Sequence, residues 1–271
     1  MTNSCRSSKG FICFTIIIAA VLVTVVCGGQ SKQKRPHIGV FRDGEWYVDM
    51  NNNGSWESSG DEMFVFGGPR DQPVVGDWDG SGSDKPGVFR DGAWSLDYNG
   101  NHKWDGSSSD RSYRFGQPGD IPIVGDWDGS GKTKIGVFRN GTWYLDYNGN
   151  GIWGSPVLAR SYQFGVQGDT PVVGDWDGSG KVKLGVYRRG AWLLDYNGNG
   201  TWDNPPIDRI YNFGYPSDNP IVADWNGSGG TKIGIFRNGD WYLDLQGNGK
   251  IPSNRNYSFR GAKDIPVVFS R

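Results

Sequence analysis

The chain has 271 residues, among them 44 Gly, 14 Pro and 13 Trp, and its formal net charge is −1. Positive and negative residues are mixed along the chain and form no basic stripe, which excludes nucleic-acid binding through bulk electrostatics. Gly and Pro make up about a fifth of the residues. Without a period this fraction would indicate disorder, but with regularly spaced Trp it indicates turns between packed strands.

The first 27 residues predict a targeting segment. Arg6 and Lys9 precede an uncharged apolar run over residues 11–26, whose length falls between a signal-peptide core and a membrane-spanning helix. We therefore expect export, with residues 1–27 as a signal peptide or an N-terminal membrane anchor. Lipidation of Cys27 is a third alternative, and a spectator thiol is a fourth. Residues 28–36 are expected to be a linker, and the protein is expected to contact a membrane only through this N-terminal segment.

From residue 37 onward the chain repeats itself. The heptapeptide Gly-Asp-Trp-Asp-Gly-Ser-Gly begins at Gly76, Gly125 and Gly174, and a near copy begins at Ala223, each 49 residues after the last. A period of this length with short strand-like runs is typical of propellers and solenoids. All three cysteines precede residue 28, so the repeats are expected to contain no disulfide. Five tryptophans recur with steps of 48, 49, 49 and 49 residues: Trp46, Trp94, Trp143, Trp192 and Trp241.

One repeat unit contains four short apolar runs bounded by Gly, Asn, Asp or Pro. Dipeptides such as Asp91-Gly92 and Asn140-Gly141 join the second run to the third, and they are strong hairpin signals because both residues adopt positive φ. The unit is therefore predicted to be a four-stranded antiparallel meander, which is one propeller blade. In the third full copy the four runs are Pro171–Gly174, Leu184–Tyr187, Trp192–Asp195 and Arg209–Phe213.

The two ends of the repeat region complement each other. Residues 37–66 contain the second, third and fourth strands of a blade, and residues 264–269 contain a first strand alone. We therefore predict an all-β fold over residues 37–271, a five-bladed β-propeller in which a C-terminal strand completes the N-terminal blade. Closing the ring in this way removes the exposed edges of an open array. An open solenoid is the alternative, but it would need polar capping repeats at both ends.

An acidic loop follows the first strand of each unit. In Asp175-Trp176-Asp177-Gly178-Ser179-Gly180, oxygen side chains stand at positions 1, 3 and 5 and Gly stands at 6, as at the start of an EF-hand-type calcium loop. With Gly-Val-Phe-Arg after the loop and Phe-Gly closing the unit, residues 37–269 resemble FG-GAP and VCBS-type propeller repeats, to which units in integrin α heads are related. The resemblance implies a propeller whose acidic loops bind calcium through a further acidic ligand at position 9.

At position 9 this chain has lysine in all four copies, as Lys85, Lys134, Lys183 and Lys232. An ammonium group cannot ligate calcium and repels the ion at short range. We therefore expect the lysine to occupy the place of the ion and to bridge the two Asp residues. The alternative is a solvated lysine beside Asp residues that make Asx turns.

A second acidic loop follows the third strand and is the stronger calcium candidate. Oxygen groups stand at positions 1, 3, 5, 7 and 9, which suits calcium of extracellular affinity. The copies from Asp146 and Asp244 lack the carboxylate at position 9 and are expected to be weaker, and an Asn/Gly-rich turn without metal is the alternative. The predicted ligands are Asp49, Asn51, Asn53, Ser55 and Glu57; Asp97, Asn99, Asn101, Lys103 (through its carbonyl) and Asp105; and Asp195, Asn197, Asn199, Thr201 and Asp203.

The loops after the first and third strands of a meander lie at the same end, so all acidic loops are expected on one face. No catalytic residue pattern is present, because His37 and His102 do not recur and the repeats contain no Cys. We therefore expect an exported, extracellular or surface-displayed propeller, monomeric and not an enzyme, which acts as a calcium-stabilised protein-interaction or adhesion module. The alternative is a lectin with one glycan site per blade, in which loop residues such as Trp104 stack on sugars. A glycosidase-like enzyme is a third hypothesis.

Overall fold

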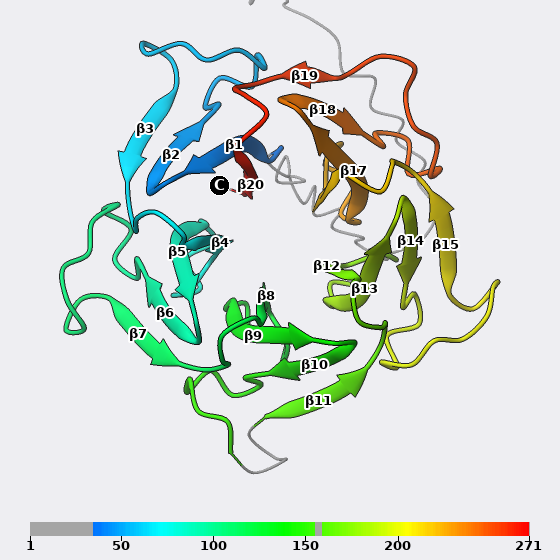
Figure 1. The fold of residues 1–271 in the computed structure, drawn as a ribbon, viewed down its shortest axis with the longest axis horizontal. Coiled ribbons are helices and arrows are strands. Elements are labelled where there is room, and N and C mark those ends of the chain that lie inside the picture. Colours follow the sequence, from blue (N-terminus) through cyan, green and yellow to red (C-terminus); the bar gives the residue numbers. More distant parts are fainter. Residues whose placement is uncertain (1–34, 155–158, 271) are drawn as a thin grey trace, which may run out of the picture. The chain divides into compact units, whose positions relative to one another are not determined.

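The computed structural model describes residues 35–154 and 159–270. Within these ranges twenty strands form five four-stranded antiparallel sheets arranged as a ring, and there is no helix (Figure 1). The predicted all-β, five-bladed propeller is confirmed. The segment 1–27 with Cys27, and residues 28–34 of the linker, lie outside the described residues. In the part of the chain that is described, no helix has the length and apolar character that a membrane crossing requires.

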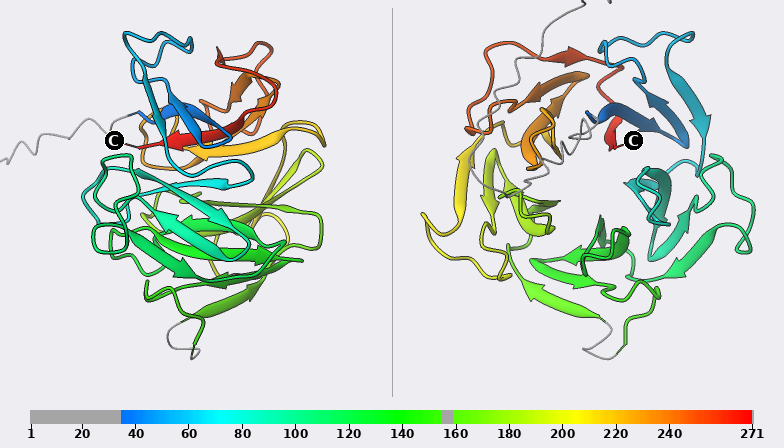
Figure 2. Two further views of the ribbon diagram at one scale, coloured as in Figure 1. Left: turned by 60° about the vertical axis from the view of Figure 1, so that its left-hand side comes forward. Right: turned by 180° about the vertical axis from the view of Figure 1, so that it is seen from behind.

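Figure 2 shows the five sheets from the side and from behind. Each sheet is a simple meander whose strands pair in chain order, except that the last strand of the chain joins the first blade. Blade 1 comprises β20 (Ile265–Phe269), β1 (His37–Arg42), β2 (Glu45–Val48) and β3 (Glu62–Val65). Blade 2 comprises β4 (Gln72–Gly76), β5 (Lys85–Arg90), β6 (Ala93–Leu96) and β7 (Arg111–Arg114). Blade 3 comprises β8 (Ile121–Gly125), β9 (Lys134–Arg139), β10 (Thr142–Leu145) and β11 (Arg160–Gln163). Blade 4 comprises β12 (Thr170–Gly174), β13 (Lys183–Arg188), β14 (Ala191–Leu194) and β15 (Arg209–Asn212), and blade 5 comprises β16 (Asn219–Ala223), β17 (Lys232–Arg237), β18 (Asp240–Leu243) and β19 (Tyr257–Ser258).

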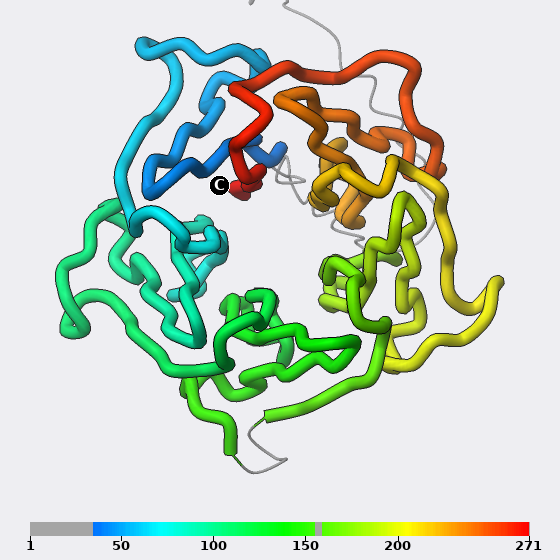
Figure 3. The backbone as a smooth tube through the Cα atoms, in the orientation of Figure 1, coloured from blue at the N-terminus to red at the C-terminus, as the bar shows by residue number. Residues whose placement is uncertain are grey.

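The ring closes through blade 1, where β20 pairs antiparallel with β1 in a register that sets His37 opposite Phe269. Figure 3 shows the blue start and the red end of the described chain side by side in this blade. The innermost strands β4, β8, β12, β16 and β20 each contact the next around the ring. Ser270 fastens the closure to blade 2, because its amide donates to Asp84 Oδ2 at 2.7 Å and its carbonyl accepts from the Asp84 amide at 2.9 Å.

The hairpin turns between the second and third strands form as predicted. At Asn140-Gly141 the φ angles are 51° and 90°, and the other four copies also have positive φ at both residues. Two positive φ angles are typical of the type I′ turn, whose twist matches that of the flanking strands. Predicted strand ends differ from the observed ends by one residue. Asp195, for example, was expected within the third strand, but β14 ends at Leu194 because the Asp195 carboxylate turns into the loop that follows.

The core lies between the blades and is built around the five repeated tryptophans, all completely buried. Trp192 contacts Tyr187 edge-on, with ring centroids 5.1 Å apart, and its Nε1 donates to the Phe213 carbonyl at 2.7 Å. The surrounding cluster includes Ile233 and Ile235 of the next blade, so this tryptophan packs in the interface between two blades. In blade 5, Trp241 Nε1 is buried without a partner.

A ring of five Arg–Asp pairs fixes the start of each blade. In blade 4, Arg188 Nε and Nη2 donate to the two carboxylate oxygens of Asp169 at 2.6 and 2.8 Å, and Asp169 Oδ2 also accepts the Val166 amide at 2.8 Å. Asp169 is almost completely buried, and such bidentate charge-assisted pairs combine strength with fixed geometry. The equivalent pairs are Arg42–Asp264, Arg90–Asp71, Arg139–Asp120 and Arg237–Asp218.

Candidate functional site

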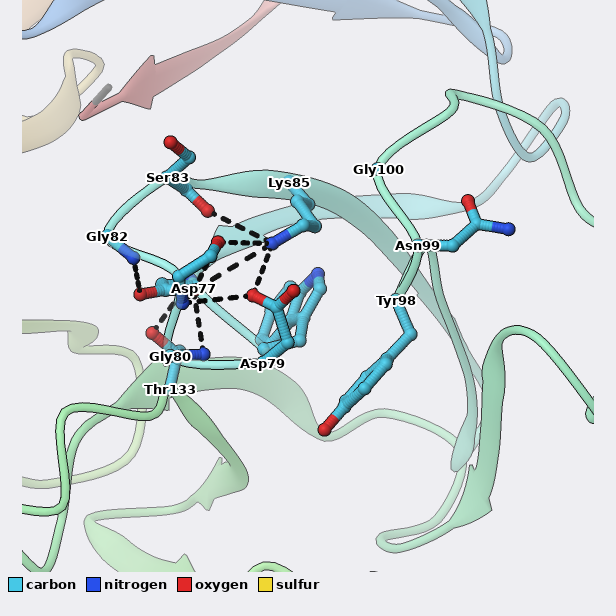
Figure 4. A network of polar contacts seen from close by, with 12 residues as sticks. Asp77, Asp79, Gly80, Gly82, Ser83, Lys85, Tyr98, Asn99, Gly100 and Thr133 are labelled. Atoms are coloured by element: carbon cyan, nitrogen blue, oxygen red, sulfur yellow. Dashed lines mark hydrogen bonds and ion pairs between the residues drawn. The ribbon is translucent and has the colours of Figure 1, made fainter.

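The loops that follow the first strand of blades 2 to 5 hold a lysine ammonium at their centre. Figure 4 shows this arrangement around Lys85, and the same geometry recurs in blades 3 and 4. The oxygen partners come from loop positions 1, 3, 5 and 7, which are the positions that ligate calcium in an EF-hand-type loop. Around Lys183 Nζ they are Asp175 Oδ1 at 3.5 Å, Asp177 Oδ1, Ser179 Oγ at 2.8 Å and the Lys181 carbonyl at 3.5 Å.

The prediction that the lysine bridges the two Asp residues is confirmed in blades 2 to 4. In these blades the alternative of a solvated lysine is wrong, because Lys85, Lys134 and Lys183 are buried. The copy at Lys232 is weaker, since Asn226 at position 3 turns its amide to the Leu245 carbonyl at 2.9 Å. Burial alone would raise the pKa of each position-3 Asp. Hydrogen bonds from lysine and serine outweigh burial and hold the pKa values of these carboxyls, such as Asp177, below their usual range.

The loops that follow the third strand fold around a buried aspartate. Asp195 accepts hydrogen bonds from the backbone amides of Gly198 at 2.8 Å, Asn199 at 3.1 Å and Gly200 at 2.7 Å. Burial raises the pKa of Asp195, although these amides act in the opposite direction. The equivalent residues Asp49, Asp97 and Asp146 show the same shift from the same cause.

The structure brings the predicted calcium ligands together in blades 2 and 4. Asp203 Oδ2 accepts from Asn197 Nδ2 at 2.8 Å and from Asn199 Nδ2 at 2.6 Å, and Asp105 accepts in the same way from Asn99 at 3.0 Å and Asn101 at 2.5 Å. The residues at position 7 donate their backbone amides to the Asn at position 5, as Lys103, Thr201 and Ser55 do. In the described part of blade 1, no hydrogen bond joins Glu57 to Asn51 or Asn53.

This geometry sets what a calcium ion would require. The Asn197 and Asn199 side-chain amides would have to turn their oxygens toward the ion. Asp203 would supply the carboxylate, because the Asp195 carboxylate already accepts backbone amides. Among the described residues no group of three or more His, Cys, Asp or Glu side chains is placed to hold a metal ion. A calcium site here would therefore depend on amide and carbonyl oxygens, which is compatible with weak extracellular affinity.

Sequence reasoning missed a second aspartate that clamps each of the three best loops. In blade 4, Asp208 accepts the backbone amides of Tyr196 at 2.9 Å and Asp203 at 2.7 Å, so it ties the two ends of the loop together. Asp110 and Asp61 do the same in blades 2 and 1. The sequence contains a signal for this role: the clamping Asp occurs only in the copies that have a carboxylate at position 9. Blade 3, which has no carboxylate there, has Ala159 in place of the clamping Asp.

Three equivalent pockets open between neighbouring blades. The volumes are about 310 Å³ between blades 2 and 3, 430 Å³ between blades 3 and 4, and 320 Å³ between blades 4 and 5. Both kinds of acidic loop line each pocket, which confirms that these loops gather at one face of the ring. One blade contributes an aromatic wall and an arginine, and the next contributes the caged lysine and the aspartate loop.

The aromatic wall has the same composition in all three pockets. A Tyr that directly follows the position-1 Asp lies under the guanidinium of an Arg at the start of the fourth strand. The distances from Cζ to ring centroid are 4.3 Å for Arg111 on Tyr98, 3.7 Å for Arg160 on Tyr147 and 4.3 Å for Arg209 on Tyr196. The walls are completed by Trp78, Leu96 and Tyr113; by Trp127, Leu145 and Tyr162; and by Trp176, Leu194 and Tyr211.

The other two interfaces are altered at these same positions. Between blades 1 and 2, Glu62 replaces the Arg and binds His102 Nδ1 at 2.9 Å, while the His102 ring stacks on Phe64 with centroids 4.0 Å apart. His102 stands where blades 3 and 4 have Gly151 and Gly200. Between blades 5 and 1, Leu245 replaces the Tyr. Both histidines that the sequence analysis singled out lie at these interfaces, since His37 stands in blade 1 where the other blades have the caged lysine.

The loop tryptophans do not line the three pockets. Trp202 packs on Phe164 with centroids 6.2 Å apart, and Trp153 packs on Phe115 at 6.0 Å. Trp104 and Trp153 remain about half exposed, at 47% and 49%. The aromatic residues that face the pockets are tyrosines, together with the Trp of each Asp-Trp-Asp loop.

Comparisons with known proteins give an architectural likeness alone. No family model and no curated protein matches the chain. A search of solved structures finds similarity to an Agrocybe aegerita lectin, whose structure is described as the basis of specific recognition of non-reducing terminal N-acetylglucosamine. The identity is 14%, over 82% of this chain and 76% of the lectin chain, with a TM-score of 0.45. At this level the likeness assigns no ligand to this chain.

Proposed function

We propose that the propeller is a recognition module that binds saccharides in its three inter-blade pockets. The observation that supports this proposal is the threefold recurrence of one pocket with the same aromatic, guanidinium and carboxylate groups. Core packing alone does not require an arginine over a tyrosine ring at each pocket. Volumes of about 310–430 Å³ fall at the small end of ligand-binding sites, which suits one sugar residue.

The chemistry of the walls matches that of a pyranose ring. One face of such a ring carries mainly C–H bonds and packs on aromatic carbon, whereas its hydroxyl groups both donate and accept hydrogen bonds. The tyrosine hydroxyls, the Arg209 guanidinium and the Gln246 amide at the pocket between blades 4 and 5 provide donors and acceptors together. Three such sites on one molecule would act multivalently on clustered glycans.

A glycan array followed by isothermal titration tests this proposal. Wild type is expected to bind one class of sugar with three sites per chain, and the Tyr98→Ala, Tyr147→Ala, Tyr196→Ala triple variant is expected to lose binding. The matched control is Leu245→Ala, since Leu245 stands at the same repeat position but lines none of the three pockets. Absence of glycan binding by wild type, or full binding by the triple variant, would overturn the proposal. Release of product from a bound glycan would indicate a glycosidase-like enzyme instead.

Three earlier expectations accompany this proposal. Export and surface display rest on the apolar run before residue 27, and a secretion assay that finds the propeller in the cytoplasm would contradict them. Calcium at the loops of Asp105 and Asp203 would stabilise the propeller, either for glycan binding or for protein-mediated adhesion. Membership of the FG-GAP and VCBS-type repeats is also proposed, on the spacing of the acidic loops and the Phe-Gly pairs.

A further inference from the structure

The propeller carries two sets of repeated arginines that differ in how their charge is compensated. The five arginines at the ends of the second strands, such as Arg188, each pair with a buried Asp. The three arginines at the pockets, Arg111, Arg160 and Arg209, have no carboxylate within ion-pair distance among the described residues. Each lies over a tyrosine ring at 3.7–4.3 Å from Cζ to the ring centroid, a contact that does not neutralise the guanidinium.

In the pocket between blades 4 and 5 the other charged groups already have partners, whereas Lys132 and Lys181 add an exposed ammonium to the other two pockets. In the pocket between blades 4 and 5, Asp177 is bound by Lys183, and Lys232 is bound by Asp224 at 3.4 Å. Asp244 accepts the backbone amides of Asn248 at 3.1 Å and Gly249 at 2.7 Å. The Arg209 guanidinium is therefore the charge left for a ligand in this pocket.

The other two interfaces have no unpaired arginine at this repeat position among the described residues. Between blades 1 and 2 the repeat position is Glu62, bound to His102 at 2.9 Å. In blade 5, Arg255 lies two residues before Tyr257, as Arg209 lies two before Tyr211, and it pairs with Asp240 at 3.4 Å. The uncompensated arginine is thus present at the three interfaces with the described pockets, whereas the other two interfaces have a glutamate or a paired arginine at this position.

We propose, on the basis of the saccharide function above, that the pockets select sugars bearing a carboxylate. The sugar ring packs on the tyrosine wall, and the guanidinium of Arg111, Arg160 or Arg209 donates paired hydrogen bonds to the carboxylate of the sugar. A planar guanidinium matches a planar carboxylate in this way. The ligand class is therefore a uronic or nonulosonic acid residue within a glycan, and the neutral parent sugar binds more weakly.

Titrations with matched sugars test this inference. Wild type is expected to bind D-galacturonate and D-glucuronate about tenfold or more tightly than D-galactose and D-glucose, as a hydrogen-bonded charge implies. The Arg111→Gln, Arg160→Gln, Arg209→Gln variant should lose this preference, so that acidic and neutral sugars bind it with similar affinity. The lysine counterpart, with the same three positions changed to Lys, should keep part of the preference, because the charge remains without the planar geometry. Arg255→Gln is the control, since that arginine already has a carboxylate partner.

The outcomes separate this inference from the proposed function. Equal affinity for acidic and neutral sugars, or a preference that survives the Gln variant, would overturn the charge selectivity while saccharide binding stands. Tighter binding of sulfated than of carboxylated sugars would overturn the carboxylate assignment. No binding of any sugar at the tyrosine walls would overturn both. Unchanged melting temperatures of the Gln and Lys variants show that the fold is intact, as expected for side chains at the pocket mouths.

Discussion

The caged lysine of blade 4 provides the sharpest test of the structure. Lys183→Met retains an aliphatic stem over Gly198 but removes the ammonium from the oxygens of Asp175, Asp177 and Ser179. These oxygens then face one another without a cation between them. We expect the variant to fold and to be less stable than wild type.

The size of the loss follows from burial. Removing one partner of a fully buried ion pair costs about 3–5 kcal/mol. The Lys183 side chain is 5% exposed, but the Asp177 side chain is 33% exposed, so water regains access to the carboxylate and part of this cost is avoided. We expect a decrease of about 2 kcal/mol in the free energy of unfolding, or about 4–8 °C in Tm for a domain of this size. Lys232→Met should lose about half as much, because position 3 of its loop is Asn226.

Thermal and urea unfolding measure these differences, with and without calcium at about 10 mM, above typical extracellular dissociation constants. Lys183→Ala should regain stability in calcium, because its empty cage presents the four oxygen groups of a calcium loop. Lys183→Met should regain little, since its side chain fills the cage. Because the pKa of Asp177 is lowered in the fold, the gap between wild type and Lys183→Met should shrink as pH falls through that pKa. A Lys183→Met protein as stable as wild type, or equal losses at Lys183 and Lys232, would refute the reasoning.

Three further predictions concern closure, core and calcium. Burial raises the pKa of Asp84 to about 6, so the contribution of Asp84 to stability should fall by up to about 2 kcal/mol as pH rises from about 4 to about 7. Urea unfolding of wild type at several pH values should show this decrease. The Asp84→Asn variant should not show it. Trp192→Phe should cost about 1 kcal/mol more than Trp241→Phe in urea unfolding, because only the first loses a hydrogen bond; equal costs would contradict the observed difference. Isothermal titration of chelator-treated protein should show weak calcium binding that decreases in Asp203→Asn, and a Tm that ignores calcium in wild type would exclude the site.

The sequence predicts the strands and the ring because each depends on residues within one 49-residue unit or on where the units are interrupted. Asn140-Gly141 fixes a hairpin by local backbone preference alone. The lysine cage was also predictable, since Lys183 and Asp177 belong to one loop. These features do not depend on how one blade packs against the next.

The pockets were not predicted, because their walls come from two blades. Arg209 and Tyr196 lie in blade 4, whereas Lys232 and Asp244 lie in blade 5, and only packing of the blades brings them together. The role of His102 was missed for the same reason: it had been noted as a break in the repeat, but its partners Glu62 and Phe64 lie across an interface. The unpaired charge of Arg209 could not be predicted either, because it depends on which partners the carboxylates of both blades have in the folded structure.

Closure through β20 has a consequence for the time course of folding. The pairing of His37 with Phe269 joins residues near opposite ends of the propeller sequence, so its loop-closure entropy is the largest of any strand pair in the domain. During synthesis blades 2 to 5 have all their strands before β20 emerges, while β1 still presents an unpaired edge. A nascent chain is therefore most prone to edge-to-edge association at that stage. Pairing of β20 with β1 then covers the exposed edge.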